Sequence, residues 1–198
     1  MTRQDTTGKQ ISLIIERFRP EFPALSDHLY NFAMESCERD EKSGALIFSG
    51  LQTELSGSFP SVIFPSIDDR ALAEVCRNSP VNFPATLLNL YRVMNGGFFG
   101  TLSLYGVVQH FGRESRAPLD VAMGDIWRVN YADAPDDLIL FASENVSWEG
   151  QVGYFMEQSG SVVGRGNLKD KAPADFGSWA DLNSWLADRL GAGKIQEG

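Results

Sequence analysis

Few residues in this chain have the spacing that metal binding or nucleophilic catalysis requires. The two histidines, His28 and His110, have no second ligand at helical spacing, and a zinc site needs three or four ligands. The two cysteines, Cys37 and Cys76, lie in segments that predict helices, and neither has the flanking residues of a reactive cysteine. We therefore expect free thiols, no metal site and no cofactor.

Two pairs of adjacent carboxylates, Asp68-Asp69 and Asp136-Asp137, are the next candidates for chemistry. Neighbouring residues point to different faces of a regular element, so neither pair is placed for joint acid–base work. The residue types instead predict caps of helices or turns. Acid–base catalysis by Asp and Glu residues that are distant in the sequence stays open as an alternative.

Two glycine motifs lack the context of a nucleotide-binding loop. Gly96-Gly97-Phe98-Phe99-Gly100 follows a predicted helix and precedes a predicted strand, whereas a dinucleotide loop runs from a strand into a helix. Gly164-Arg165-Gly166 has no third glycine and no Walker A motif is present. Nucleotide binding is not indicated.

One polar segment, from Ser143 to Gly150, combines a tryptophan with charged residues and is predicted to be a loop between two strands. A large rigid ring on such a loop suits a contact with a partner protein, although it could equally cover the edge of the sheet. The candidate partner-binding residues are Glu144, Trp148 and Glu149.

The charge of the chain limits its partners. The 198 residues include 26 acidic and 17 basic side chains, which gives a formal net charge of −9. This charge argues against nucleic acid and against anionic membrane surfaces, because both are bound through Lys and Arg. It favours a basic partner, or it serves solubility alone. With no signal peptide and no membrane-spanning apolar run, we expect a soluble cytoplasmic protein.

Hydrophobic periodicity predicts the elements of the first third of the chain. Apolar residues predict helices over residues 11–18 and 26–38, a strand at 45–48, and one edge strand at 62–64 within a loop. We expect residues 1–67 to form a helical and loop extension that packs on the core domain.

The remaining chain predicts a core domain over residues 68–192. Short polar turns separate predicted strands at residues 138–142, 151–156 and 161–163, and a short helix is predicted at 123–129. Such spacing favours an antiparallel meander, so the fold class is α+β.

A closing helix is predicted to begin with a capping box at Ser178 and Asp181. Its buried face should contain Trp179, Leu182, Trp185, Leu186 and Leu190, and Trp185→Ala should be milder than a core truncation if the Trp185 ring lies at the edge of that face. Residues 193–198 are predicted to be a disordered tail.

The segment from Phe83 to Gly97 has the most distinctive pattern. Pro84 is predicted to occupy the first helical position, and Tyr91 belongs to the apolar stripe of that helix. Asn95-Gly96-Gly97 is predicted to end the helix as a C-cap with at least one residue at positive φ.

This segment resembles the signature of the SMI1/KNR4 (SUKH) superfamily. In that family an apolar residue and Pro open a helix that carries a Leu and an aromatic residue and closes on Asn-Gly-Gly. The resemblance covers about Leu72 to Leu190. It implies a compact α+β domain with a twisted antiparallel sheet and flanking helices, and it implies no shared catalytic residues.

The resemblance also implies a function. Many bacterial members look like immunity proteins that neutralise polymorphic or contact-dependent toxins, and eukaryotic relatives are regulatory scaffolds. We therefore expect a bacterial, non-enzymatic protein-binding domain whose partner is a protein, such as a basic toxin domain. The alternatives are a small enzyme that uses Asp and Glu residues, or a regulatory scaffold.

Overall fold

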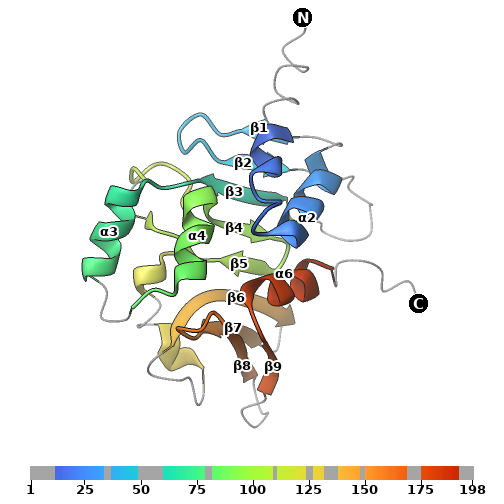
Figure 1. Ribbon diagram of the computed structural model, residues 1–198, viewed down its shortest axis with the longest axis vertical. Coiled ribbons are helices and arrows are strands. Elements are labelled where there is room, and N and C mark those ends of the chain that lie inside the picture. Colours follow the sequence, from blue (N-terminus) through green and yellow to red (C-terminus); the bar gives the residue numbers. More distant parts are fainter. Residues whose placement is uncertain are drawn as a thin grey trace, which may run out of the picture.

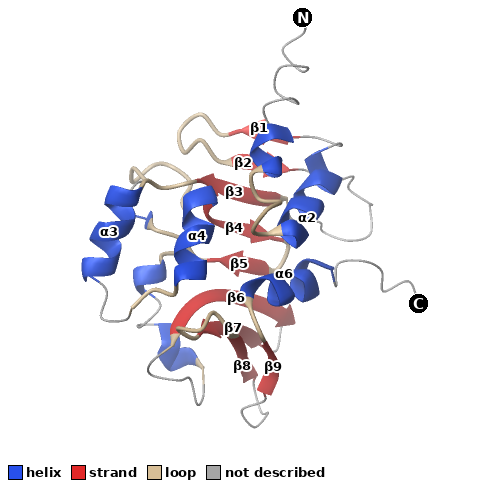
Figure 2. Cartoon of the chain, viewed as in Figure 1, coloured by secondary structure: helices blue, strands red, loops and turns tan. Residues whose placement is uncertain are grey.

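The computed structural model describes residues 12–33, 37–48, 60–78, 82–108, 111–123, 127–131, 138–147, 150–168 and 175–191. Within these residues, nine strands form one open antiparallel sheet whose spatial order is the sequence order, from β1 to β9. Figure 1 shows the sheet twisting from end to end, and Figure 2 shows its strands in red behind blue helices. The fold is therefore mixed α/β with an antiparallel sheet, as the sequence predicts.

The strands are β1 (Cys37–Arg39), β2 (Leu46–Phe48), β3 (Ser61–Pro65), β4 (Met94–Phe99), β5 (Leu102–Leu104), β6 (Ile139–Ser147), β7 (Gly150–Met156), β8 (Val162–Leu168) and β9 (Asp175–Trp179). The α-helices with defined bounds are α2 (Pro23–Ala33), α3 (Asp69–Asn78), α4 (Ala85–Val93) and α6 (Leu182–Gly191). Two short 3-10 helices are η2 (Val121–Met123) and η3 (Arg128–Asn130).

The main core lies between the sheet and the helices α2, α4 and α6, which cover one face of it (Figure 1). Helix side chains such as Leu29, Leu87 and Trp185 meet strand side chains such as Ile63 and Phe141 there. A smaller cluster occupies the opposite face of β2–β4, and its members are Ala45, Ile47, Val62, Phe64, Phe98 and Phe111. The two clusters together explain why several strands are buried on both faces.

The first 67 residues supply three strands of this sheet. β3 pairs with β2 on one side and with β4 on the other, so residues 62–64 form an interior strand and the predicted edge strand is wrong. Ile63 faces the main core, whereas Val62 and Phe64 face the smaller cluster. No break in the sheet falls at residue 67, because β3 is hydrogen-bonded to β4.

The predicted helix over residues 26–38 is displaced. α2 begins at Pro23 and ends at Ala33, and Cys37 belongs to the edge strand β1. Proline is well suited to a first helical position because its missing N–H has no partner there. Ser26 lies inside the helix instead of capping it, and its hydroxyl donates to the carbonyl of Ile15 at 3.2 Å. The earlier predicted helix is confirmed for residues 12–16, which are helical.

The capping role predicted for Asp68 is confirmed. Its Oδ1 accepts the N–H of Ala71 at 2.8 Å at the start of α3. Pro84 precedes the first helical residue of α4 by one position, so it is the N-cap and not the first helical residue. Tyr91 is buried on the core face of α4, as the apolar stripe predicts. Asp69 accepts from Arg92 at 2.9 Å and links α3 to α4.

Asn95-Gly96-Gly97 does not form the predicted helix C-cap. α4 ends at Val93, Met94 is already extended with φ −151°, and all three residues lie in β4. Gly96 has φ +75°, so the predicted positive φ is confirmed, but it belongs to a bulge. One residue of β3 faces two residues of β4 between the pairs Ile63–Gly97 and Pro65–Met94.

The start of the closing helix also differs from the prediction. Ser178 lies in β9, where it pairs with Val163 of β8. The helix is capped by Asp181 alone, whose Oδ1 accepts the N–H of Ser184 at 2.7 Å. Burial of Trp185 on the predicted face is confirmed, and its ring is fully buried and not at the edge. The placement of Trp179 in the helix is wrong, because Trp179 lies in β9 and is half-buried. Burial of Leu182 and Leu186 is confirmed. Residues 193–198, the predicted tail, lie outside the described residues.

The three predicted strands of the second half are confirmed as β6, β7 and β8, and β6 and β8 are longer than expected. Of the predicted helix over residues 123–129, Trp127 is α-helical, Met123 belongs to η2, Arg128 and Val129 belong to η3, and residues 124–126 lie outside the described residues. None of the helices that the structure describes is long and apolar enough to cross a membrane.

Candidate functional site

Of the three predicted partner-binding residues, the structure places one. Glu144 lies within β6, where it pairs with Leu102 of β5 and Val152 of β7, so the predicted loop does not begin at Ser143. β6 continues to Ser147 because the polar side chains of this segment do not prevent its backbone from pairing with β7. Trp148 and Glu149 lie outside the described residues.

Glu144 belongs to a compact group of side chains around one arginine, which we call the Arg189 cluster: Glu144, Tyr154, Trp179, Asp188 and Arg189. Arg189 Nη1 lies 3.5 Å from Glu144 Oε2 and 3.3 Å from the Tyr154 hydroxyl oxygen. Its Nη2 donates to Asp188 Oδ2 at 2.7 Å. The guanidinium carbon lies 5.5 Å from the centre of the Trp179 ring, within cation–π range.

Four elements bring this cluster together. β6 and β7 are antiparallel neighbours in which Glu144 pairs with Val152, so Tyr154, two residues further on, lies on the same face of the sheet. α6 supplies Asp188 and Arg189, and β9 supplies Trp179, whose indole Nε1 donates to Asp188 Oδ2 at 3.0 Å. The cluster therefore joins the end of α6 to three strands.

Aromatic rings support the cluster from below. The centre of the fully buried Trp185 ring lies 5.0 Å from the ring centre of Tyr154 and 4.9 Å from that of Phe141, in edge-to-face contacts. Tyr154 also contacts Trp179, with ring centres 5.8 Å apart. Because buried rings have few alternative rotamers, they fix the position of the polar atoms above them.

The ionisation states of the cluster follow from burial and hydrogen bonding. Burial raises the pKa of Tyr154, and the bond to Glu144 raises it further, so the hydroxyl keeps its proton and donates to Glu144 Oε2 at 2.6 Å. Burial lowers the pKa of Arg189, but bonds to Asp188 and Tyr154 outweigh it, and the pKa is raised overall. Counted by formal charge, the cluster's Glu144, Asp188 and Arg189 leave one net negative charge.

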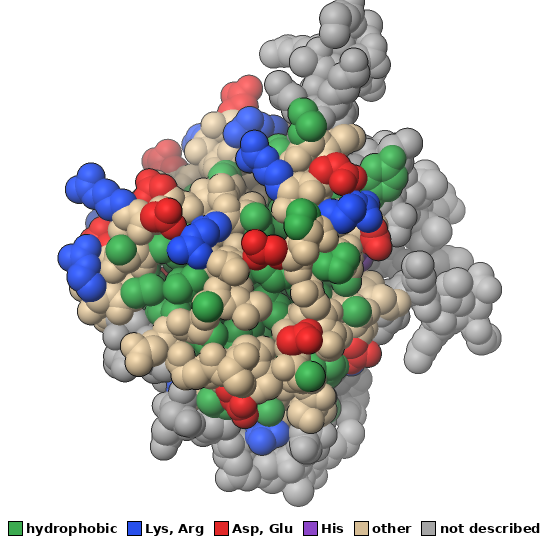
Figure 3. Space-filling model, viewed as in Figure 1, with side chains coloured by type: hydrophobic (Ala, Val, Ile, Leu, Met, Phe, Trp, Pro, Cys, Tyr) green, Lys and Arg blue, Asp and Glu red, His purple; other side chains and the backbone are tan. Residues whose placement is uncertain are grey.

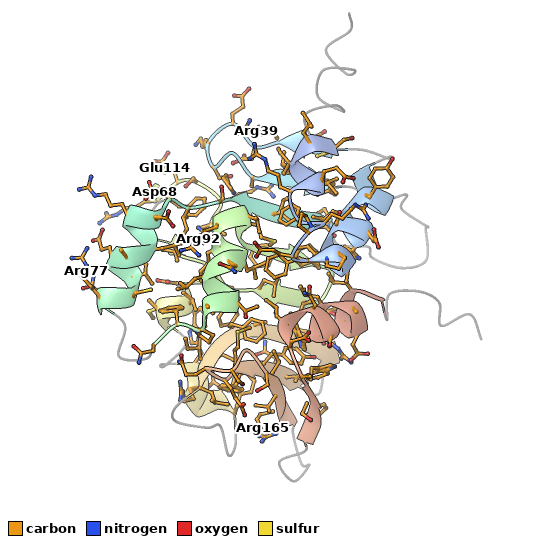
Figure 4. All side chains as sticks on the ribbon, in the orientation of Figure 1. Arg39, Asp68, Arg77, Arg92, Glu114 and Arg165 are labelled. Carbon is orange, nitrogen blue, oxygen red and sulfur yellow. The ribbon has the colours of Figure 1, made fainter. Side chains whose placement is uncertain are left out.

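The acidic charge of the sequence is concentrated in its C-terminal part, to which the residues of this cluster belong. Residues 119–198 include 13 acidic and 6 basic side chains, whereas residues 1–118 include 13 and 11. Among the described residues from 119 on, six side chains are acidic and three are basic. We call the part of the structure formed by β6–β9 and α6 the acidic end. In Figure 4, Arg39, Arg77 and Arg92 lie toward the other end together with Asp68 and Glu114, whereas Arg165 lies at the acidic end. Figure 3 shows most Lys and Arg side chains of that face at the other end, mixed with Asp and Glu side chains.

A shallow hollow of about 260 Å³ lies at the other end of the sheet, between the β1–β2 turn, the start of α3 and the 111–115 loop. Its charged lining residues are already paired. Lys42 lies 3.7 Å from Glu114, and Asp68 accepts the N–H of Ala71. Asp68 is the only carboxylate among the described lining residues, so the hollow does not contain a pair of acidic groups.

The other residues that the sequence offered for catalysis or metal binding are held in packing and backbone contacts or lie outside the described residues. His28 lies between α2 and α6, where it bonds to the backbone of Leu190 and meets the Phe99 ring edge-on at 5.7 Å. Burial, with a smaller contribution from Glu38, raises the pKa of Cys37 to about 11, so its thiol stays protonated. Among the described residues no group of three His, Cys, Asp or Glu side chains is arranged for a metal ion. His110 and Asp136-Asp137 lie outside them.

Sequence reasoning identified Glu144 but missed the four residues around it. Trp185 and Arg189 are four residues apart on one helix, which is the only local signal for the cluster. The contacts with β6, β7 and β9 depend on strand pairing that local patterns do not encode. No family model, no curated protein and no solved structure matches this chain.

Proposed function

We propose that this protein is a non-enzymatic binding domain whose acidic end binds a basic protein, and that it acts as an immunity protein against a toxin in the cytoplasm. The observation that carries this proposal is the unequal charge of two parts of the sequence. Residues 119–198, which include the acidic end, have more than twice as many acidic as basic side chains, whereas residues 1–118 are nearly balanced.

An unequal charge distribution of this kind has a physical consequence for binding. Opposite charges attract over about 8–10 Å at moderate salt, which orients a basic partner before contact and raises its association rate. Many toxins are nucleases, whose active faces are basic because they bind phosphate. A domain with an acidic end can cover such a face and exclude the nucleic acid.

The pattern from Phe83 to Gly97 supports the same proposal through its resemblance to the SMI1/KNR4 superfamily. The helix that follows Pro84 carries Tyr91 on its buried face and leads directly into Asn95-Gly96-Gly97. The proposed contacts are Glu144, with Trp148 and Glu149, which stand between β6 and β7 in the sequence and lie outside the described residues.

The test is to purify this protein with the toxin domain encoded beside its gene and to measure binding by titration calorimetry. We expect a one-to-one complex that blocks the toxin's activity, and we expect Trp148→Ala to weaken it without lowering the denaturation midpoint. No complex, together with turnover of a substrate that is abolished by one Asp or Glu substitution, would establish the enzyme alternative instead.

A further inference from the structure

The Arg189 cluster already contains a cation, which shows what kind of group it can hold. The guanidinium of Arg189 lies over the Trp179 ring and donates to two carboxylates, those of Glu144 and Asp188. Aromatic faces and carboxylates are the two environments that bind guanidinium groups most strongly in proteins. The cluster is thus a cation-binding arrangement made of this chain's own residues.

The hydrogen bonds of the cluster use only one oxygen of each carboxylate. Glu144 Oε2 accepts from Tyr154 and Arg189, and Asp188 Oδ2 accepts from Trp179 and Arg189. Within the described part of the chain, Glu144 Oε1 and Asp188 Oδ1 have no hydrogen-bond donor. Each carboxylate is therefore held in place through one of its oxygens by donors of this chain.

Charge balance points to a second cation. Two carboxylates and one guanidinium leave a net charge of −1, and a second guanidinium would neutralise it. The side chain of Asp188 is 47% exposed and that of Glu144 is 19% exposed, so Asp188 is the accessible member. A carboxylate that is already oriented loses little side-chain entropy when it binds, which favours affinity.

We propose that Asp188, with Trp179 and Glu144, forms the position on the acidic end that binds an arginine side chain of the basic protein partner. This inference rests on the proposed function and names the chemistry of one contact within it. Arginine is favoured over lysine because its planar fork can donate to a carboxylate and stack on an aromatic ring at the same time.

A second arginine of the protein provides a matched control. Arg19 also lies between two carboxylates, with distances of 3.2 Å to Glu16 and 2.9 Å to Asp27. These carboxylates are more exposed, at 52% and 64%, and no aromatic ring within the described residues lies over Arg19. Asp27→Asn removes the same charge as Asp188→Asn but leaves the Arg189 cluster intact.

The experiment titrates the full chain with capped peptides of alternating arginine and glycine, and with the same peptides carrying lysine or citrulline. The readout is the NMR signal of the Trp179 indole N–H, which is bonded to Asp188 and is assigned by its loss in Trp179→Phe. We expect saturable shifts with the arginine peptide, weaker binding of the lysine peptide and no binding of the citrulline peptide. Asp188→Asn should weaken arginine binding by about tenfold, and Asp27→Asn by less than about twofold.

Equal losses in the two variants, or equal affinity for arginine and lysine, would mean general electrostatic attraction and would overturn the inference. The proposed function has a separate outcome. A protein partner that binds Asp188→Asn and Glu144→Gln as tightly as wild type rejects this arginine position and leaves the proposed function in place. Peptide binding as described, without any protein partner, rejects the proposed function alone.

Discussion

The side-chain amide of Asn95 forms two hydrogen bonds with the backbone of Val107. Its Nδ2 donates to the Val107 carbonyl at 2.9 Å, and its Oδ1 accepts the Val107 N–H at 2.7 Å. Asn95 is fully buried at the bulge of β4, so its amide replaces the backbone of a strand where regular pairing is interrupted. This role explains a buried polar residue in the middle of the core.

Asn95→Ala should therefore destabilise the protein strongly. The substitution leaves a buried N–H and a buried carbonyl of Val107 without partners, and each costs roughly 1–3 kcal/mol. We expect a loss of about 2–4 kcal/mol in the free energy of unfolding, measured by urea denaturation. Asn89→Ala, on the half-exposed side of α4, should cost less than about 0.5 kcal/mol, and an equal loss in both variants would contradict this role.

Substitutions at Gly96 and Gly100 distinguish two causes of destabilisation: the strained backbone conformation at positive φ, and the steric clash of an added Cβ with neighbouring atoms. Both have positive φ, +75° and +61°, but a Cβ at Gly96 would lie 2.8 Å from the Leu104 carbonyl oxygen, whereas one at Gly100 meets nothing within 4 Å. Gly100→Ala should cost about 1 kcal/mol for conformation alone, and Gly96→Ala clearly more. Equal denaturation midpoints for the two variants would exclude the close approach of β4 to the backbone after β5.

Trp185→Ala should destabilise the protein more than Trp179→Ala. Trp185 is fully buried against Phe141 and Tyr154, and such a truncation typically costs about 3–5 kcal/mol. Trp179 is half-buried at the edge strand and loses less contact area. Both values come from chemical denaturation, and a larger loss for Trp179→Ala would contradict the packing described for α6.

The stability of the α2–α6 contact should depend on pH through His28. Burial lowers the pKa of His28 below its ordinary value of 6.5, although the bond to Leu190 opposes the shift. The unfolded chain therefore binds this proton at a higher pH than the folded protein does, so stability falls as pH drops below about 6.5. In urea denaturation at about pH 7.5 and about pH 5.5, wild type should lose more stability than His28→Gln, and parallel losses would exclude His28 as the cause.

Local patterns predicted much of the fold because many elements are defined by their own residues. The stripe of α4, the cap at Asp68 and the strands β6–β8 each follow from spacing and residue type. The predictions are wrong where the pairing of strands that are distant in the sequence determines the local structure. Asn95-Gly96-Gly97 has the composition of a helix cap, but the pairing of β4 with β3, in which Met94 faces Pro65 and Gly97 faces Ile63, makes it part of a strand.

The candidate site shows the same division. The sequence indicated Glu144 from its position beside a tryptophan, but it could not place Arg189 next to it, 45 residues further along the chain. That contact requires β6, β7 and α6 to be assembled first. Tyr154 and Asp188, the polar partners of Arg189, do not stand out in the sequence and become distinctive only through their hydrogen bonds with Arg189.

The most direct test of the central claim is the salt dependence of association with the basic partner, measured by stopped-flow mixing for wild type and for a variant that combines Glu144→Gln, Glu149→Gln and Asp188→Asn. Electrostatic steering predicts that the wild-type association rate falls by at least about tenfold between about 0.05 M and about 0.5 M salt. The variant should associate more slowly at low salt and depend less on salt. Identical rates and identical salt dependence for the two proteins would contradict binding through the acidic end.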